Sequence, residues 1–269
     1  MGIVLIGICG YSYTEWIGSF YPPKTNQEEF LEFYSRNFPT VELDYTYYRM
    51  PTADQLNRML EAGGPDLTFA IKATDTLTHK VDPNKWQDEA KTYKTAIEPV
   101  LAAGRLEAVL FQFPNSFHYL PDNRRYLDKL LKEFAGIPSV VEFRNSEWGN
   151  SKVILELKKR GVTYASMDLP DLEGLPPVLD VATSTLAYFR LHGRNTEKWQ
   201  GSNSGDRYDY LYNSTELEGA AERIKRIVLK TDRVLVYFNN HTRGQAPQNA
   251  QMLKKILEKS GLSLGGERK

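Results

Sequence analysis

Residues 187–194 end in three side chains that could carry acid–base or anion-binding chemistry. The stretch reads Ala-Tyr-Phe-Arg-Leu-His-Gly-Arg, which places Arg190, His192 and Arg194 at every second position. Successive side chains of a strand point to opposite faces, so these three would share one face of a strand. An imidazole can transfer protons near neutral pH, and a guanidinium binds anionic groups. The stretch therefore predicts a cationic, titratable site at the end of a buried strand.

Other apolar runs of the chain also end in polar side chains. In the runs that contain Glu42, Glu142 and Asp168, the polar residues are again spaced by two, so they can face one interior. The full set is Glu42 and Asp44, Lys72, Gln112, Glu142 and Arg144, Ser166 and Asp168, and Asn239 and Asn240. We expect these groups to converge on one pocket. The alternative is that the acids and bases only neutralise one another, because unpaired buried charges are unfavourable.

The elements that must position these groups alternate along the chain. Apolar, β-branched runs predict eight strands, at 3–9, 40–45, 67–73, 106–113, 139–144, 162–168, 185–192 and 233–239. Amphipathic stretches predict helices at 27–37, 52–62, 85–103, 122–134, 151–160, 215–229 and 247–259. This alternation predicts an α/β fold, a single-domain (β/α)₈ TIM barrel over residues 1–269. The alternative, an open doubly wound sheet, would more often carry a Gly-x-Gly-x-x-Gly fingerprint, and Gly7 and Gly10 have the wrong spacing.

Three long connections follow predicted strands, so in a barrel they lie on the face where the strands end. They span 11–26, 74–84 and 193–214 and are rich in aromatic and polar residues, which suits a lid or a stacking platform. Tyr11 in the first connection and Tyr47 after the second strand are candidate ligand contacts. The connection 169–183 is rich in Pro, Leu and Asp, and we expect only a short or irregular helix there.

Composition restricts the classes of function. Hydrophobic residues make up 41% and charged residues 25%, as is ordinary for a globular protein in water. The chain has 34 basic and 34 acidic residues, which is unlike a dedicated nucleic-acid-binding protein. The single cysteine, Cys9, excludes an intramolecular disulfide and fits a reducing compartment. Since we find no basic leader and no membrane-length apolar run, we expect a cytoplasmic protein with no membrane partner.

Seven motifs along the chain resemble those of one family. They are Gly7-Ile-Cys-Gly-Tyr, Val41-Glu-Leu-Asp, Phe69-Ala-Ile-Lys-Ala, Leu110-Phe-Gln-Phe-Pro, Val141-Glu-Phe-Arg, Tyr188-Phe-Arg-Leu-His-Gly-Arg and Phe238-Asn-Asn-His. In this order and over nearly the whole chain, they resemble the YecE-like family, known as domain of unknown function 72. The resemblance implies a TIM barrel similar to those of sugar isomerases and abasic-site endonucleases, with no assigned reaction. Cys9, Asp44 and Asn145 stand where the family usually has Ser, Asn and His, so roles that need those side chains are not carried over.

The first functional hypothesis is a site for a small anionic, phosphate-bearing ligand, because barrels often bind phosphate with the loops after strands seven and eight. The expected ligand contacts are Arg190, Arg194, Asn239, Asn240, Arg144, Gln112, Tyr11 and Tyr47. His192 and Lys72 are the candidate acid–base groups. Glu42 and Glu142 are the carboxylates expected to orient or charge them. If the protein is an enzyme, this set suits a hydrolase, lyase or isomerase of phosphorylated or nucleotide-like substrates.

Other hypotheses remain open on the sequence. Endonuclease-type phosphodiester cleavage would need a divalent metal, for which Glu42, Asp44 and Asp168 are candidate ligands. We favour a metal less, because the four histidines show no zinc-like spacing, and we expect no organic cofactor. Nucleic-acid binding through stacked tyrosines is disfavoured by the neutral charge.

Two further hypotheses use the same residues. Glycoside hydrolysis by Glu42 and Glu142 is a weaker fit, since many barrel glycosidases place their carboxylates after strands four and seven, where this chain has Gln112 and His192. A non-catalytic ligand sensor would have the same pocket without chemistry.

Overall fold

Parallel strands form the centre of the structure. The computed structural model describes residues 2–199 and 204–266. Within them, nine parallel strands form one sheet in the order β6-β5-β4-β3-β2-β1-β9-β8-β7. The strands are β1 (Ile3–Cys9), β2 (Thr40–Leu43), β3 (Thr68–Lys72), β4 (Leu106–Phe113), β5 (Ser139–Phe143), β6 (Thr163–Tyr164), β7 (Ser166–Asp168), β8 (Leu186–Leu191) and β9 (Arg233–Phe238). They match the eight predicted runs, because β6 and β7 are the two halves of the sixth run.

The sixth run closes the sheet into a barrel. Its first half, β6, pairs with β5, and its second half, β7, pairs with β8, so both edges of the sheet meet at Ala165. The Ala165 N–H still donates to the carbonyl oxygen of Val141, 2.9 Å away. The predicted TIM barrel is therefore confirmed.

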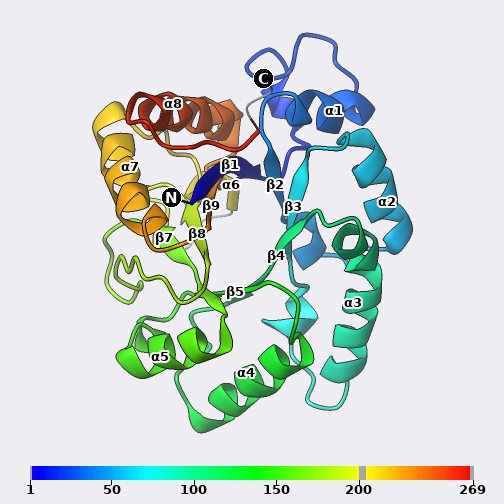
Figure 1. Cartoon of the computed structure of the whole chain (residues 1–269), viewed down its shortest axis with the longest axis vertical. Coiled ribbons are helices and arrows are strands. Elements are labelled where there is room, and N and C mark those ends of the chain that lie inside the picture. The colour runs from blue at the N-terminus through cyan, green and yellow to red at the C-terminus, as the bar shows by residue number, and fades with distance from the viewer. Residues whose placement is uncertain (1, 200–203, 267–269) are drawn as a thin grey trace.

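Helices pack around the outside of this barrel, except for the short α6, which lies behind the barrel centre in Figure 1. They are α1 (Phe30–Ser35), α2 (Ala53–Ala62), α3 (Trp86–Ala102), α4 (Pro121–Glu133), α5 (Ser151–Arg160), α6 (Ser204–Arg207), α7 (Ser214–Val228) and α8 (Gln245–Lys259). The four-residue α6 lies in the connection 193–214, of which residues 200–203 lie outside the described residues. The other seven correspond to the predicted helices.

The connection 169–183 differs from its prediction. All of its residues are described and none is helical, so the expected short or irregular helix there is wrong. Pro170, Pro176 and Pro177 explain this, because proline has no N–H for a helical hydrogen bond and disfavours the helical conformation of the residue before it.

Two apolar layers hold the barrel together. The larger cluster of buried residues lies between the strands and the helices. A smaller cluster fills the barrel interior and consists of Leu5, Cys9, Ala70, Ala108, Leu110, Val140, Ala165, Tyr188, Leu235 and Tyr237. Because side chains alternate along a strand, the next inward position after these residues is polar on several strands. These inward polar residues are Lys72, Gln112, Glu142, Arg190 and Asn239.

In the sixth run the other set of alternate residues faces inward. Ala165 points inward, so Ser166 and Asp168 point away from the interior, and the prediction that they face the barrel axis is wrong. Asp168 instead meets Arg223 of α7, with Nη1 of Arg223 2.8 Å from its Oδ2. The left-handed conformation of Gly193, with φ of 90°, also turns the following Arg194 toward Asp168.

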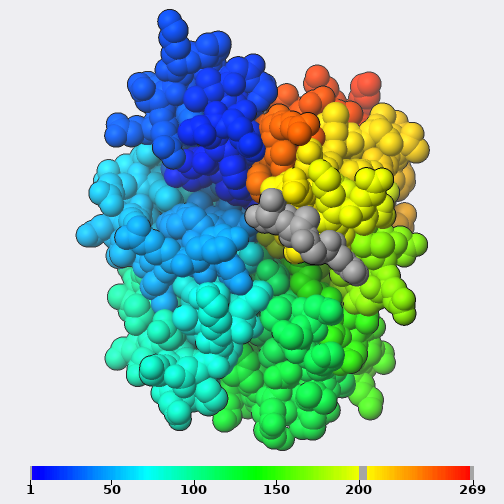
Figure 2. All heavy atoms as spheres, turned by 180° about the vertical axis from the view of Figure 1, so that it is seen from behind, coloured from blue at the N-terminus to red at the C-terminus, as the bar shows by residue number. Residues whose placement is uncertain are grey.

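The connections that follow the strands gather on one face of the barrel (Figure 2). There the blue N-terminal connection lies beside the orange segment that follows β9. The indole N–H of Trp16 donates to the carbonyl oxygen of His241 at 2.7 Å, and the ring of Tyr13 stacks on the His241 ring with centroids 4.8 Å apart. In the part of the chain that is described, no helix is long and apolar enough to cross a bilayer.

The contact between β1 and β2 gives a test of the barrel packing. Gly7 pairs with Thr40, and a Cβ at Gly7 would overlap the carbonyl oxygen of Thr40. We expect Gly7→Ala to lower the free energy of unfolding by about 1–3 kcal/mol, because backbone atoms cannot move aside cheaply. Gly219→Ala on α7, where the added Cβ meets open space, should instead raise it by about 0.5–1 kcal/mol. Urea denaturation of both variants measures this, and a harmless Gly7→Ala would refute the proposed close packing.

Candidate functional site

The guanidinium of Arg190 occupies the centre of the barrel where the strands end. Its Nε and Nη2 donate to Glu42 at 3.0 and 2.6 Å, and its Nη1 donates to Glu142 at 2.9 Å. Nη2 also lies 3.6 Å from Sγ of Cys9 and 3.5 Å from Oδ1 of Asp44. Arg190 is 1% exposed, and both glutamates are fully buried. One cation thus ties β2, β5 and β8 together, and all its nitrogens bind protein groups.

A second set of contacts extends from Glu142. The Nε of Arg144 donates to Oε1 of Glu142 at 2.6 Å, and Nε2 of His192 lies 3.6 Å from the same oxygen. The side-chain amide of Asn239 lies 2.9 Å from Nδ1 of His192. Nη2 of Arg144 also lies 3.2 Å from Nε2 and 3.4 Å from Nδ1 of the same ring, so donors from Asn239 and Arg144 face both ring nitrogens.

Lys72 at the end of β3 pairs with Asp44, which directly follows β2. Its Nζ lies 3.3 Å from Oδ1 of Asp44 and 4.6 Å from the centre of the Tyr47 ring. The His79 ring meets Tyr47 edge-on, with centroids 4.8 Å apart. We call Lys72, His79 and Arg144 the cationic corner, because the charges of Lys72 and Arg144 both act on His79.

Burial and neighbouring charges fix the protonation states. Burial and the Arg144 charge lower the pKa of His192 to about 3. Burial and the Lys72 charge lower the pKa of His79 to about 4. Burial alone would lower the pKa of Lys72, but the Asp44 carboxylate outweighs it and the pKa is raised. At neutral pH both imidazoles are therefore neutral, and Lys72 carries its proton.

The two carboxyl groups on Arg190 differ in acidity. Burial raises the pKa of Glu42 in spite of Arg190. Burial acts in the same direction on Glu142, but Arg144 and Arg190 together hold its pKa well below the ordinary range. Glu42 also accepts a hydrogen bond from the hydroxyl of Tyr188 at 2.5 Å. Glu142 is thus a fixed anion, whereas Glu42 is the more easily protonated partner.

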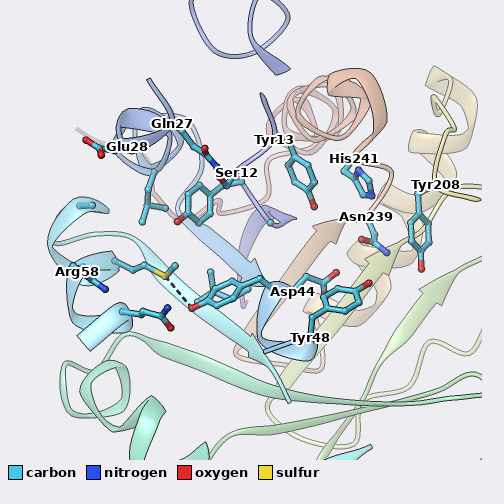
Figure 3. A pocket seen from close by; sticks show the side chains of 18 residues that line it. Ser12, Tyr13, Gln27, Glu28, Asp44, Tyr48, Arg58, Tyr208, Asn239 and His241 are labelled. Atoms are coloured by element: carbon cyan, nitrogen blue, oxygen red, sulfur yellow. Dashed lines mark hydrogen bonds between the residues drawn. The ribbon is translucent and has the colours of Figure 1, made fainter. Parts of the chain in front are cut away.

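An open pocket of about 710 Å³ lies beside this network (Figure 3). Its lining is rich in tyrosine and includes Tyr11, Tyr13, Tyr45, Tyr48 and Tyr208, with Ser12, Gln27, Glu28, Gln55 and Arg58 among its polar groups. In Figure 3, Asp44, Asn239, His241 and Tyr208 lie together at one end, far from Glu28 and Arg58. We call this the inner end. It adjoins the buried network, because Asp44 contacts Lys72 and Asn239 contacts His192.

The structure brings most of the predicted site residues together. The network contains Glu42, Lys72, Glu142, Arg144, Arg190, His192 and Asn239, with Tyr47 beside Lys72. Gln112 pairs with Glu142 across β4 and β5 and is 8% exposed. Tyr11 lines the pocket.

Arg194 and Asn240 lie outside this network. Both oxygens of Asp168 accept from Arg194, at 2.7 and 2.8 Å, so this arginine forms an ion pair between β7 and the connection that follows β8. Asn240 has the opposite orientation to Asn239, and its amide donates to the Tyr210 carbonyl and to Asn249 of α8, each at 2.8 Å. Sequence alternation could have separated Asn240 from Asn239, but the partner of Arg194 has no local signal.

Tyr13, Tyr208 and His241 also line the pocket. Tyr208 and Tyr13 belong to the aromatic connections that the sequence singles out, and His241 directly follows the predicted pair of asparagines. The Tyr208 ring lies 5.9 Å from the His192 ring and 6.0 Å from the His241 ring. Tyr208 therefore covers the junction between the pocket and the network.

Three of the carboxylates considered for a metal or for glycoside hydrolysis, Glu42, Glu142 and Asp168, are already bound by arginines. Among residues 2–199 and 204–266, no group of three or more His, Cys, Asp and Glu side chains could hold a metal ion. Arg190 binds Glu42 and Glu142, and Arg194 and Arg223 bind Asp168. These carboxylates thus act within the protein.

The three positions that depart from the family pattern have different surroundings. Burial raises the pKa of Cys9 well above its usual value, so it is a thiol against Arg190. Asn145 caps the turn Ser146–Trp148, accepting from the N–H of Glu147 at 2.9 Å. Asp44 alone of the three lines the pocket.

Comparison with known proteins agrees with the motifs. A family model described as "Protein of unknown function DUF72" matches residues 5–268. The chain belongs to the DUF72 family. The resemblance inferred from the sequence motifs is therefore confirmed.

Relatives of this DUF72 protein match it from end to end. UPF0759 protein YunF of Bacillus subtilis (strain 168) is 30% identical over 278 residues, which cover 97% of this chain and 98% of that protein. A crystal structure of a DUF72 family protein from Thermotoga maritima is 35% identical, with a TM-score of 0.87 over 95% of this chain and 99% of that one. Another, from Enterococcus faecalis V583, is 23% identical with a TM-score of 0.86, covers 95% and 96% of the two chains, and shares the fold.

Removing the central cation should destabilise the protein strongly. Arg190→Met leaves Glu42 and Glu142 buried without their shared partner, and we expect a loss of about 3–5 kcal/mol in the free energy of unfolding. Arg36→Met is the matched control, since its pair with Glu32 is 59% exposed on both sides, and should cost about 1 kcal/mol or less. Urea denaturation followed by circular dichroism compares them. Equal losses would show that Arg190 is not the centre of the network.

The low pKa of His192 predicts a pH dependence of stability. Its pKa is about 3 in the folded state against 6.5 for the free side chain, so the unfolded chain binds the proton more readily. Stability is then highest above pH 6.5 and falls on acidification toward pH 3, by about 1.4 kcal/mol per pH unit from His192. We expect His192→Gln to flatten this slope between about pH 6 and pH 5, above the range where carboxylates titrate. An unchanged slope in urea denaturation would refute the assignment.

Proposed function

We propose that this DUF72 protein binds a small phosphate-bearing ligand where the pocket meets the cationic corner, and moves a proton on it. The positive field at the cationic corner supports the proposal: burial together with the charges of Lys72 and Arg144 keeps His79 neutral. The balancing glutamates are fully buried, whereas the side chains of Lys72 and Arg144 are 11% and 13% exposed. An incoming ligand would therefore meet the cations before it meets Glu42 or Glu142.

Lys72 and Asp44 fit the roles of acid and base in this proposal. The Lys72 ammonium retains proton donors beyond its single contact with Asp44, at 3.3 Å. Burial acts to raise the pKa of Asp44, but Lys72 and Arg190 outweigh it and the pKa is lowered, so the group is a carboxylate. One proton donor and one acceptor side by side suit isomerisation or elimination, in which a proton leaves one ligand atom and another is delivered nearby.

The other predicted catalytic residues act as positioning groups in this scheme. His192 is neutral with a pKa of about 3, so it is a poor proton donor at neutral pH and instead orients Asn239. Glu142 and Glu42 hold Arg190, whose Nη2 lies 3.5 Å from Asp44. The network thus keeps Asp44 ionised and in place.

Thermal-shift measurements with inorganic phosphate test the anion site. A ligand at one hundred times its Kd stabilises the native state by about 2.7 kcal/mol, so phosphate should raise the Tm by several degrees. Lys72→Met should abolish this rise, while Lys72→Arg should retain part of it. The exposed Lys91 gives the matched control, and Lys91→Met should respond like the parent protein.

The pKa of His79 gives an independent measure. A bound anion offsets the field of Lys72 and Arg144, so phosphate should raise the pKa of His79 from about 4 in an NMR titration. No Tm rise in the parent protein, or the same rise in Lys72→Met, would overturn the proposed phosphate site.

A further inference from the structure

Two buried polar atoms at the inner end of the pocket have no hydrogen-bond partner. They are Oδ1 of Asp44 and Nδ1 of His241, and neither makes a hydrogen bond within the described part of the chain. Oδ1 of Asp44 has two cationic neighbours, Nζ of Lys72 at 3.3 Å and Nη2 of Arg190 at 3.5 Å, and Nδ1 of His241 lies 4.0 Å from Glu15. Buried polar groups in native proteins are normally hydrogen-bonded, so these two atoms point to a ligand that completes them.

We propose that Asp44 and His241 form a hydroxyl-binding subsite, which makes the ligand a phosphorylated sugar or polyol with two adjacent hydroxyl groups. This inference rests on the proposed function, which assigns the phosphate group. It adds the hydroxyl-bearing part of the same ligand. Asp44 and His241 line the same end of the pocket (Figure 3).

The protonation states match hydroxyl groups. Asp44 is a carboxylate, which only accepts hydrogen bonds. Burial lowers the pKa of His241 against the opposing effect of Glu15 and Asp44, so its ring is neutral and offers one N–H and one lone pair. A hydroxyl group can donate to the Asp44 carboxylate. It can also donate to, or accept from, the His241 ring. A phosphate would be repelled by Asp44, so it belongs beside Lys72 and Arg144 instead.

The walls of the inner end suit the apolar face of a sugar ring. Tyr13 stacks on His241 with an interplanar angle of 9°, so Tyr13 covers one face of the His241 ring. Tyr208 lies across from it, 6.0 Å from His241 at an angle of 60°. Asn239 supplies a further amide between the pocket and His192. Aromatic faces with a carboxylate and amides between them bind the C–H and O–H groups of a polyol together.

Calorimetric titration with matched sugar phosphates tests the subsite. We expect the parent protein to bind ribose 5-phosphate about tenfold to hundredfold more tightly than 2-deoxyribose 5-phosphate, because the missing hydroxyl leaves a buried group unpaired. Asp44→Asn and His241→Phe should both bring this ratio close to one. His241→Phe retains a ring against Tyr13, so it changes hydrogen bonding more than packing. Asp54→Asn, at an exposed acid on α2, is the matched control and should keep the parent ratio.

The outcomes separate this inference from the proposed function. If inorganic phosphate stabilises the parent protein but the two sugar phosphates bind equally, the hydroxyl subsite is wrong and the phosphate site stands. If free ribose binds more tightly than free 2-deoxyribose while inorganic phosphate has no effect, the subsite stands and the phosphate site is wrong. A ratio that survives in His241→Phe overturns the role of His241, and a parent protein that binds none of these probes overturns both proposals.

Discussion

The buried guanidinium of Arg190 is the interaction on which the rest of the site depends. Four hydrogen bonds of this planar cation are directed to Glu42, Glu142 and the sulfur of Cys9. A single buried charge on Arg190, Glu42 or Glu142 would be strongly unfavourable. Their mutual pairing offsets the cost of burying them. The pairing crosses the barrel, because Glu42, Glu142 and Arg190 are the penultimate residues of β2, β5 and β8. The barrel end is therefore a rigid, filled structure rather than an open well.

Because the barrel axis is filled, the open pocket lies to one side of it. The barrel interior is closed by Arg190 and its partners, so the open volume lies to the side of β1 and β2, beneath the N-terminal connection. The stacking of Tyr13 on His241 and the hydrogen bond from Trp16 to the His241 carbonyl hold that connection against the segment after β9. The first connection is thus part of the pocket wall, which explains why it is rich in aromatic residues.

The sequence specified the strands and the inward-facing polar residues better than the ion pairs. Period-two alternation placed Lys72, Glu142, Arg190 and Asn239 correctly, because it follows directly from strand geometry. The same rule misplaced Asp168, because the inward residue of the sixth run is Ala165, and an apolar run gives no sign of which alternate set faces inward. Arg194 was misassigned for a different reason. Its position depends on the turn at Gly193 and on Asp168, which Arg223 of a distant helix also binds.

Asp44 shows how a charged network can keep a carboxylate ionised beside a pocket without adding net charge. Three acids, Glu42, Asp44 and Glu142, face three bases, Lys72, Arg144 and Arg190, so the local formal charge is zero. The three acids differ in burial. The two glutamates are fully buried, whereas the Asp44 side chain is 25% exposed. Because Arg190 is held by both glutamates, it cannot move toward Asp44, which keeps one ionised oxygen without a hydrogen bond. The neutralising network therefore explains why this carboxylate stays both ionised and available on the pocket side.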